Sequence, residues 1–199
     1  MDQKISIRDV GRRAIRHQIS DAALARFKSN GFHETTVEHI ASDVGMSTRT
    51  FFRYFKSKDD VLLEAIYTFR EQFLTSLKSN LQTANMWDAL GAALEVGLLD
   101  CFDPAQDRRN REMHTLIRST PALLARELEV FEKLQAEVLS LFAPQAASLG
   151  VATVNAVIGS AFACYHSSKA HLPNDATIEG AADSLQKLMA ALRPAVIRS

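Results

Sequence analysis

The sequence predicts an all-helical protein, and three observations support this prediction. Apolar residues recur every three or four positions through most of the chain, as they do along the buried face of a helix. No segment alternates apolar and polar residues in the manner of a strand. Ser, Thr, Gly and Pro stand at the ends of the periodic segments, where helices begin and end. The length of 199 residues suits one domain or two small ones.

The bulk composition is that of an ordinary globular protein. Hydrophobic residues make up 47% of the chain and charged residues 23%, which is typical of globular domains. No apolar run is long enough to span a bilayer, and the N-terminus lacks the apolar core of a signal peptide. We therefore expect a cytoplasmic protein. Cys101 and Cys164 lack the spacing of metal ligands, which favours two reduced thiols in the core.

The first predicted helix ends at Asn30 and Gly31, because glycine readily adopts the left-handed conformation that follows a helix. Its buried face carries Ile15, Ile19, Ala22, Ala23 and Phe27. A basic run leads into this helix and consists of Arg8, Arg12, Arg13 and Arg16. Such a run either lines a solvated helix face or reaches the phosphates or the minor groove of a nucleic acid, and both interpretations stay open.

Two short helices with a glycine turn between them are predicted next. Thr35 and Glu38 have the spacing of a capping box, which places the start of the first short helix at Thr35. Gly45 ends it, and Ser47 can cap the second. Ala41 is small enough to let the two helices cross closely. The apolar residues that face inward are Val37, Ile40, Ala41 and Val44 on the first, and Phe51, Tyr54 and Phe55 on the second.

This pattern is typical of a helix-turn-helix, in which the second helix enters the DNA major groove. The outer side of that helix, near its start, carries Thr48, Arg49, Thr50 and Arg53. The net charge of the chain is zero, yet residues 1–60 contain 11 Lys or Arg against 8 Asp or Glu, whereas residues 61–199 contain 12 against 15. The excess of positive charge therefore lies with the motif. Two amphipathic helices inside a helical core remain the alternative interpretation.

Residues 13–62 resemble the N-terminal domain of TetR-family transcriptional regulators. The matching positions are Ile19, Ala22, Ala23, Phe27, Gly31, Thr35, Thr36, Val37, Ile40, Ala41, Val44, Gly45, Met46, Ser47, Thr50, Phe55, Ser57, Lys58 and Leu62. Three positions depart from the family pattern: Arg49 replaces a frequent glycine, Phe52 a usual tyrosine, and Tyr54 a common histidine. Phe52 therefore lacks the hydroxyl that touches a phosphate in many members, although Tyr54 can supply one nearby. Arg49 suggests an additional contact with a base or a phosphate.

The resemblance and the motif together predict the DNA-binding residues. We expect Thr48, Arg49, Thr50 and Arg53 to face base edges or nearby phosphates. We expect the DNA backbone to be contacted by Thr36, Phe52, Tyr54 and Lys58. Lys58 lies in the first turn of a predicted helix, where a cation is mildly unfavourable, so a phosphate partner would explain it.

A fourth helix is predicted to begin at Ser57 and to continue without a break through Val61 and Leu62 to Leu77. A continuous helix of this kind can move the recognition helix when its far end shifts. We therefore expect a helix-turn-helix DNA-binding domain over residues 1–56. Residues 57–199 are expected to form a helical bundle that binds a ligand and dimerises. Its further helices are predicted over residues 86–102, 106–119, 121–142, 151–170 and from 174 onward.

The last two helices differ from the others in having small or apolar faces. Ala152, Ala156, Gly159 and Ala163 recur at helical spacing on one. The face of the other carries Ile178, Ala182, Leu185, Leu188, Met189 and Leu192. Such faces suit either the core of one chain or a four-helix interface across a two-fold axis. The resemblance implies the second, a homodimer, which also suits two successive major grooves about 34–36 Å apart.

The bundle also contains candidate ligand-binding residues, namely Phe69, Phe73, Trp87, Leu94, Leu98, His114, Ile117 and Phe131. Core packing explains most of this apolar set, and a satisfied, partly buried histidine explains His114 better than a polar group inside a pocket does. The resemblance to TetR-like proteins implies a cavity here, for an apolar or amphipathic small molecule. A fatty acyl or acyl-CoA-like effector would follow if Arg118 and Arg126 received its anionic head group.

We expect no enzymatic activity, no cofactor and no bound metal. His166 and His171 are not spaced to share one helix face, and the chain shows no phosphate-binding glycine loop and no nucleophile elbow. The predicted function is therefore a ligand-responsive DNA-binding transcriptional regulator, in the form of a repressor released from its operator by its effector. The alternatives are a helical ligand-binding or scaffold protein with a vestigial helix-turn-helix, and an enzyme built within the bundle.

Overall fold

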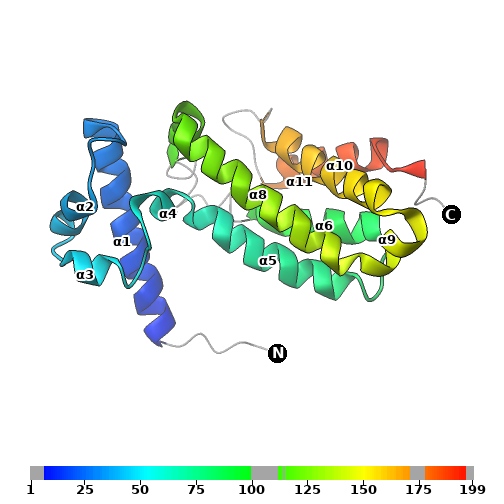
Figure 1. The fold of residues 1–199 in the computed structure, drawn as a ribbon, viewed down its shortest axis with the longest axis horizontal. Helices are drawn as coiled ribbons and strands as arrows, with labels where there is room; N and C mark the ends of the chain where they lie inside the picture. The colour runs from blue at the N-terminus through cyan, green and yellow to red at the C-terminus, as the bar shows by residue number, and fades with distance from the viewer. Residues whose placement is uncertain (1–6, 100–111, 114, 171–177, 196–199) are drawn as a thin grey trace. The chain divides into compact units, whose positions relative to one another are not determined.

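The computed structural model describes residues 7–99, 112–113, 115–170 and 178–195. Within these residues the regular structure is helical and no strand occurs, so the all-α prediction is confirmed (Figure 1). The helices are α1 (Ile7–Asn30), α2 (Val37–Asp43), α3 (Thr48–Phe51), α4 (Lys58–Leu62), α5 (Glu64–Asn80), α6 (Met86–Leu99), α8 (Pro121–Leu141), α9 (Ala143–Leu149), α10 (Val151–Ala170) and α11 (Ile178–Ala191). None of the described helices is long and apolar enough to cross a membrane.

The chain divides into two compact units. The first comprises Met1–Ala65 and Arg109–Ala125, and the second comprises Ile66–Arg108 and Arg126–Ser199. An ion pair between Lys28 Nζ and Glu112 Oε1, 3.0 Å apart, lies within the first unit. The functional division predicted between residues 56 and 57 remains a prediction.

The first unit is built around the buried face of α1. Ile19, Ala23 and Phe27 lie fully or almost fully buried, as the helical spacing predicted. Gly31 then ends the helix with a φ of 85°, a left-handed value that a side chain would strain. The rest of this core consists of Leu24, Phe32, Ile40, Ala41, Phe51, Phe55, Val61, Leu62 and Leu63.

The start of α2 lies one residue later than predicted. Thr36, not Thr35, caps the helix, and its partner in the capping box is His39 rather than Glu38. The His39 N–H donates to Thr36 Oγ1 and the Thr36 N–H donates to His39 Nδ1, both at 3.3 Å. Thr35 is instead buried, and its hydroxyl donates to the Gly31 carbonyl at 2.8 Å. Two adjacent threonines satisfy the sequence pattern equally well, and burial of the first decides between them.

The turn between α2 and α3 has the predicted form. Gly45 adopts a φ of 69°, and the Met46 N–H donates to the Ala41 carbonyl at 2.9 Å. Ser47 caps α3, because its hydroxyl accepts a hydrogen bond from the Thr50 N–H at 3.1 Å. Buried Ala41 allows the close crossing of the two helices that a helix-turn-helix requires.

The long helix predicted from residue 57 is interrupted. Ser57 caps α4, as predicted, through a hydrogen bond from the Asp60 N–H at 3.2 Å. The helix ends at Leu62, and α5 begins at Glu64. Leu63, between them, is fully buried with a ψ of 2°, so it anchors the junction in the core while the backbone leaves helical geometry.

The core of the second unit is formed by α5, α6, α8, α10 and α11. Aromatic rings dominate it, and Phe69 stacks on Tyr165 with ring centroids 5.1 Å apart. The Trp87 indole N–H donates to the Met189 carbonyl at 2.9 Å, which joins α6 to α11. A Cβ placed on Gly97 would lie 2.2 Å from the Phe69 ring, so this ring of α5 occupies the space that a side chain at position 97 of α6 would need.

Candidate functional site

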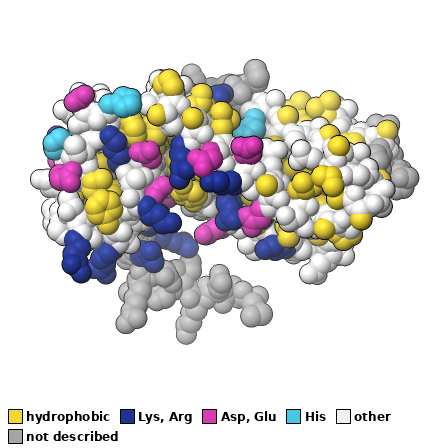
Figure 2. Space-filling model, viewed as in Figure 1, with side chains coloured by type: hydrophobic (Ala, Val, Ile, Leu, Met, Phe, Trp, Pro, Cys, Tyr) yellow, Lys and Arg dark blue, Asp and Glu magenta, His cyan; other side chains and the backbone are white. Residues whose placement is uncertain are grey.

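The outer face of the helix-turn-helix carries the residues that the sequence assigned to DNA. Arg49, Phe52 and Arg53 are exposed, and so is Thr36 at the start of α2. The half-buried members of the set are Thr48, Thr50 and Tyr54. Figure 2 shows Lys and Arg side chains gathered on the surface of the first unit, in the region of α1 and α3. The structure therefore brings these predicted residues together, and their contacts with DNA remain predictions.

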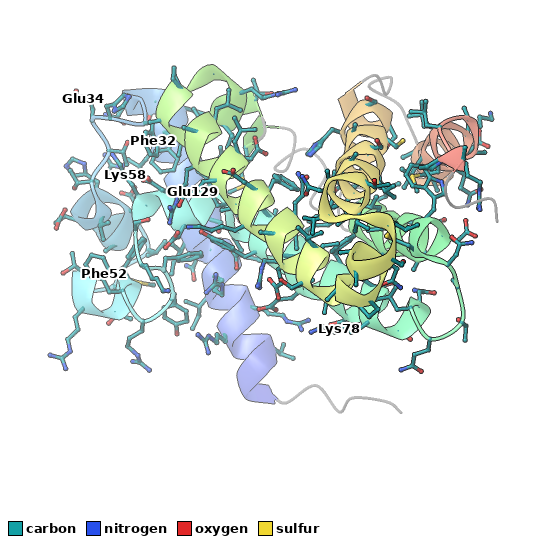
Figure 3. The ribbon with its side chains drawn as sticks, turned by 45° about the vertical axis from the view of Figure 1, so that its right-hand side comes forward. Phe32, Glu34, Phe52, Lys58, Lys78 and Glu129 are labelled. Carbon is teal, nitrogen blue, oxygen red and sulfur yellow. The ribbon has the colours of Figure 1, made fainter. Side chains whose placement is uncertain are left out.

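Buried aromatic side chains hold the inner side of α3 against the core of the first unit. Phe51 and Phe55 are buried with ring centroids 5.9 Å apart, and Phe52 meets the edge of the Phe51 ring from the exposed side. Phe52 remains 53% exposed (Figure 3). The Ser47 and Thr50 hydroxyls lie 2.9 Å apart, so the Thr50 hydroxyl also belongs to the helix cap.

Arg16 supports this motif from α1 and does not extend into solvent as Arg12 and Arg13 do. Its guanidinium donates to the Glu64 carboxylate and to the Tyr54 carbonyl, and lies over the Phe55 ring, 4.2 Å from the centroid. Ser20 Oγ donates to the second carboxylate oxygen of Glu64 at 3.2 Å. We call Arg16, Ser20, Tyr54 and Glu64 the Arg16 cluster. The sequence pattern did not reveal this cluster, because Tyr54 and Glu64 lie 38 and 48 residues from Arg16 along the chain.

Two other members of the basic run fit the surface interpretation. Arg12 and Arg13 are exposed on α1, so they form a solvated face that is also open to phosphates. The side chain of Arg8 lies outside the described residues.

Lys58 has partners inside the first unit. Its ammonium group donates to the carbonyl oxygens of Phe32 at 2.6 Å, Thr35 at 2.7 Å and His33 at 3.3 Å. It also lies 4.4 Å from the centre of the Phe32 ring. The sequence offered no local explanation for a cation here, and the structure supplies one.

A second ion pair fixes α2 on α1. Arg26 donates from Nε and from an NH2 group to the two carboxylate oxygens of Asp43, at 2.5 and 2.7 Å. These hydrogen bonds hold the pKa of Asp43 below its ordinary value of 3.8. The pair is exposed, so it contributes to the orientation of α2 more than to overall stability.

The predicted ligand-binding residues form a packed core. Six of them, Phe69, Phe73, Trp87, Leu94, Leu98 and Phe131, belong to one buried cluster in the second unit. Ile117 is also buried, but it lies in the first unit, and His114 lies outside the described residues. The set is therefore only partly brought together. Sequence periodicity identified burial correctly, yet it does not distinguish a cavity wall from a filled core.

Among the described residues, two hollows on the surface of the second unit are of interest. One, of about 310 Å³, is lined by Tyr67, Arg70, Arg126, Val130, Lys133 and Glu137 on α5 and α8. The other, of about 350 Å³ between α6 and α11, is lined by Trp87, Asp88, Gly91, Ala92, Glu95, Leu185, Gln186, Met189, Ala190 and Arg193. Of the predicted ligand-binding residues that the structure describes, Trp87 alone lines either of these hollows. Arg126 lies at the first hollow, whereas Arg118 is exposed in the first unit.

Among the described residues, no group of three His, Cys, Asp or Glu side chains could hold a metal ion. Cys164 is buried, and burial raises the pKa of its thiol, which disfavours the reactive thiolate. Cys101 lies outside the described residues. Cys164 is therefore the core thiol that the sequence predicted.

The small-residue face of α10 is open to solvent in the single chain. Ala152, Ala156 and Ala163 are exposed, and Gly159 is half-buried. Large apolar side chains are also exposed in this unit, with Val151 and Leu128 at 60% and Leu192 at 55%. On α11, by contrast, Leu185 and Met189 are buried within the chain. The predicted interface face is thus exposed on α10 and only in part on α11.

The comparisons with known proteins agree with this geometry. Residues 19–65 match the model of the family described as bacterial regulatory proteins, tetR family. The HTH-type transcriptional regulator TcmR of Streptomyces glaucescens is 33% identical over 135 residues, which cover 66% of this chain and 60% of TcmR. The putative mycofactocin biosynthesis transcriptional regulator MftR of Mycobacterium tuberculosis is 34% identical over 125 residues, which cover 61% of this chain and 62% of MftR. The matched part thus spans about three fifths of these relatives.

Solved structures show the same fold. A putative TetR-family regulator from Syntrophomonas wolfei aligns with a TM-score of 0.59 at 18% identity, covering 90% of this chain and 95% of that one. SmeT, in a complex with triclosan, aligns with a TM-score of 0.54 at 19% identity, covering 89% and 91%. At such identities the likeness concerns the fold alone. The matched segment contains α2, α3 and α4 and the end of α1, so residues 19–65 form a domain similar to that of the tetR family of bacterial regulatory proteins.

Proposed function

We propose that this protein is a DNA-binding transcriptional regulator of the bacterial cytoplasm. The observation that carries the proposal is the capped helix-turn-helix of α2 and α3, which presents Arg49 and Arg53 to solvent within the segment that matches the family. The relatives named above are described as transcriptional regulators, which supports the same function. A vestigial motif is not favoured, because the caps, the Gly45 turn and the exposed cations are all intact.

The exposed residues divide into two expected roles. Arg49 and Arg53 have the reach and the planar donors to read guanine edges or to bind phosphates, and Thr48 and Thr50 are close to them on α3. Thr36, Phe52 and Tyr54 are expected to contact the DNA backbone, which fixes orientation without reading sequence. Phe52 has no hydroxyl, so it can contribute only an apolar contact with a sugar or a base methyl group.

We further propose that the regulator is a homodimer. The exposed small residues of α10, together with Val151, form a surface on which the same face of a second copy can pack closely. A dimer of this kind carries two recognition helices. Two copies of α3 could then occupy successive major grooves, which a single copy cannot do.

A small-molecule effector is the third part of the proposal, and an apolar or amphipathic compound suits it best. SmeT, with a similar fold, is described in a complex with triclosan, which supports small-molecule binding in this bundle. In the present structure the aromatic residues pack against one another, so a ligand must bind a more open state more tightly. The effector would release DNA, and the regulator would act as a repressor, if that open state holds the two recognition helices at the wrong separation. A fatty acyl or acyl-CoA-like compound remains one candidate.

Selection of DNA from a random pool, followed by measurement of affinity, tests the DNA-binding role. The wild-type protein should enrich a sequence with two-fold symmetry and bind it about a thousandfold more tightly than random DNA. Arg49→Ala should reduce this preference while largely retaining affinity for random DNA. Failure to enrich any sequence, or an equal loss on selected and random DNA, would contradict the roles assigned here.

A further inference from the structure

Lys58, the first residue of α4, has a role that its exposed neighbours do not share. We infer that Lys58 is a positioning residue for DNA recognition, which holds the loop between α1 and α2 and does not itself bind a phosphate. The inference rests on the proposed DNA-binding function, and it replaces the phosphate contact that the sequence predicted for this lysine. We call Lys58 and the carbonyl groups of Phe32, His33 and Thr35 the Lys58 clamp.

The hydrogen-bonding capacity of the ammonium group is fully used. A lysine ammonium has three N–H donors and no acceptor, and three carbonyl oxygens lie at 2.6, 2.7 and 3.3 Å from Lys58 Nζ. The Phe32 ring lies 4.4 Å away and adds a cation–π contact (Figure 3). A phosphate could bind this group only by displacing at least one carbonyl from it.

The loop depends on the clamp because the carbonyl groups of Phe32, His33 and Thr35 lie between α1 and α2 and accept their hydrogen bonds from Lys58. Phe32 is buried and packs on Phe27, with ring centroids 5.1 Å apart. Thr35 is buried as well, and its hydroxyl is bound to the Gly31 carbonyl. With both side chains directed into the core, the carbonyls of the loop point toward α4, where Lys58 supplies the donors.

The clamp thereby fixes where α2 begins. Thr36 follows the clamped Thr35 carbonyl directly and caps α2 through the His39 N–H. A short turn connects the end of α2 to the start of α3. The position at which α2 begins therefore also affects the position of α3, the recognition helix. Thr36 is itself exposed and is a proposed backbone contact, so a loose clamp would affect DNA affinity through Thr36.

One substitution and a matched control test the clamp without DNA. Lys58→Met keeps the hydrocarbon stem and removes all three donors, and Lys56→Met removes the same charge from an exposed site two residues away. The clamp predicts that Lys58→Met lowers the midpoint of thermal unfolding by roughly 4 °C or more, whereas Lys56→Met leaves it unchanged. Amide hydrogen exchange of residues 33–40 should accelerate only in Lys58→Met. Equal behaviour of the two variants would overturn the clamp.

The salt dependence of DNA binding separates positioning from phosphate contact. Loss of one phosphate contact reduces the slope of log K against log salt by about 0.9. We expect Lys58→Met to weaken binding about tenfold with an unchanged slope, and Arg53→Met to reduce the slope. Lys58→Arg keeps a cation that could reach a phosphate, but it replaces the compact ammonium group with a larger, planar guanidinium that does not fit the clamp. The Lys58→Arg variant should therefore bind DNA as weakly as Lys58→Met.

Three results would overturn the inference: a slope reduced by about 0.9 in Lys58→Met, normal unfolding of that variant, or normal DNA binding by Lys58→Arg. If the methionine variant does not fold, the clamp is supported, and Lys58→Arg then carries the DNA measurement. If the wild-type protein binds no DNA, the proposed function fails, while the unfolding and exchange measurements still decide whether the clamp exists.

Discussion

Replacement of Arg16 by methionine should destabilise the first unit, although the sequence left open only a solvated helix face or a contact with nucleic acid for this arginine. The change keeps most of the side-chain stem and removes the guanidinium from the Arg16 cluster. Glu64 then loses its charged partner, and the hydrogen bond from Ser20 remains. The Tyr54 carbonyl, three residues after the end of α3, loses the hydrogen bond from Arg16 as well.

The size of the effect follows from the burial of the pair. The side chains of Arg16 and Glu64 are 24% and 22% exposed, so the pair lies between an exposed ion pair, at about 0.2–1 kcal/mol, and a buried one that loses a partner, at about 3–5 kcal/mol. With the second hydrogen bond and the contact over Phe55, we expect a loss of about 2–3 kcal/mol. At about 2–4 °C per kcal/mol, the midpoint should fall by roughly 4–12 °C.

Thermal unfolding followed by circular dichroism measures this loss, and a double-mutant cycle with Glu64→Gln isolates the pair. The coupling between Arg16 and Glu64 should reach about 1 kcal/mol. Arg12→Met is the matched control, since Arg12 is exposed on the same helix and its replacement should change stability by less than about 0.5 kcal/mol. If Arg16→Met behaves like the control, or if the two losses simply add, the assigned role of the cluster is wrong.

Two further predictions concern packing and pH. Gly97→Ala should cost about 1–3 kcal/mol by overpacking, because the new Cβ would lie 2.2 Å from the Phe69 ring. Gly91→Ala on the same helix meets only a flexible methionine side chain at 3.3 Å and should be far milder in urea unfolding. Asp43 has a folded pKa below its ordinary 3.8 because Arg26 binds it, so its stabilising contribution is present above that pH and is lost as the pH falls through the folded value. Asp43→Asn should therefore flatten the decline of stability at acid pH, and an unchanged acid profile would count against the pair.

Much of the fold could be predicted from the sequence because its signals are local. The Gly45 turn and the caps at Ser47 and Ser57 depend on residues within one helical turn of each other, and all three are confirmed. The cap at Thr36 was placed one residue early, because only burial in the folded unit distinguishes it from Thr35.

The contacts that organise the candidate site were not predictable, because they join distant residues. Lys58 is 23 to 26 residues from its carbonyl partners, and Arg16 is 48 residues from Glu64. Backbone carbonyls leave no mark in a sequence, so a cation with such partners looks unpaired and suggests an external anion. The break at Leu63 was missed for a related reason, since its residues have ordinary helical periodicity and the fold alone bends the chain there.

Titration of a labelled fragment from upstream of the protein's own gene, at several salt concentrations and with random DNA as competitor, tests the central claim most directly. A specific DNA-binding regulator predicts nanomolar binding that survives the competitor, with two protomers on each site. It also predicts a loss of about a thousandfold or more between 50 and 200 mM salt. Weak binding without preference, on this fragment and on sequences selected from a random pool, would contradict the account.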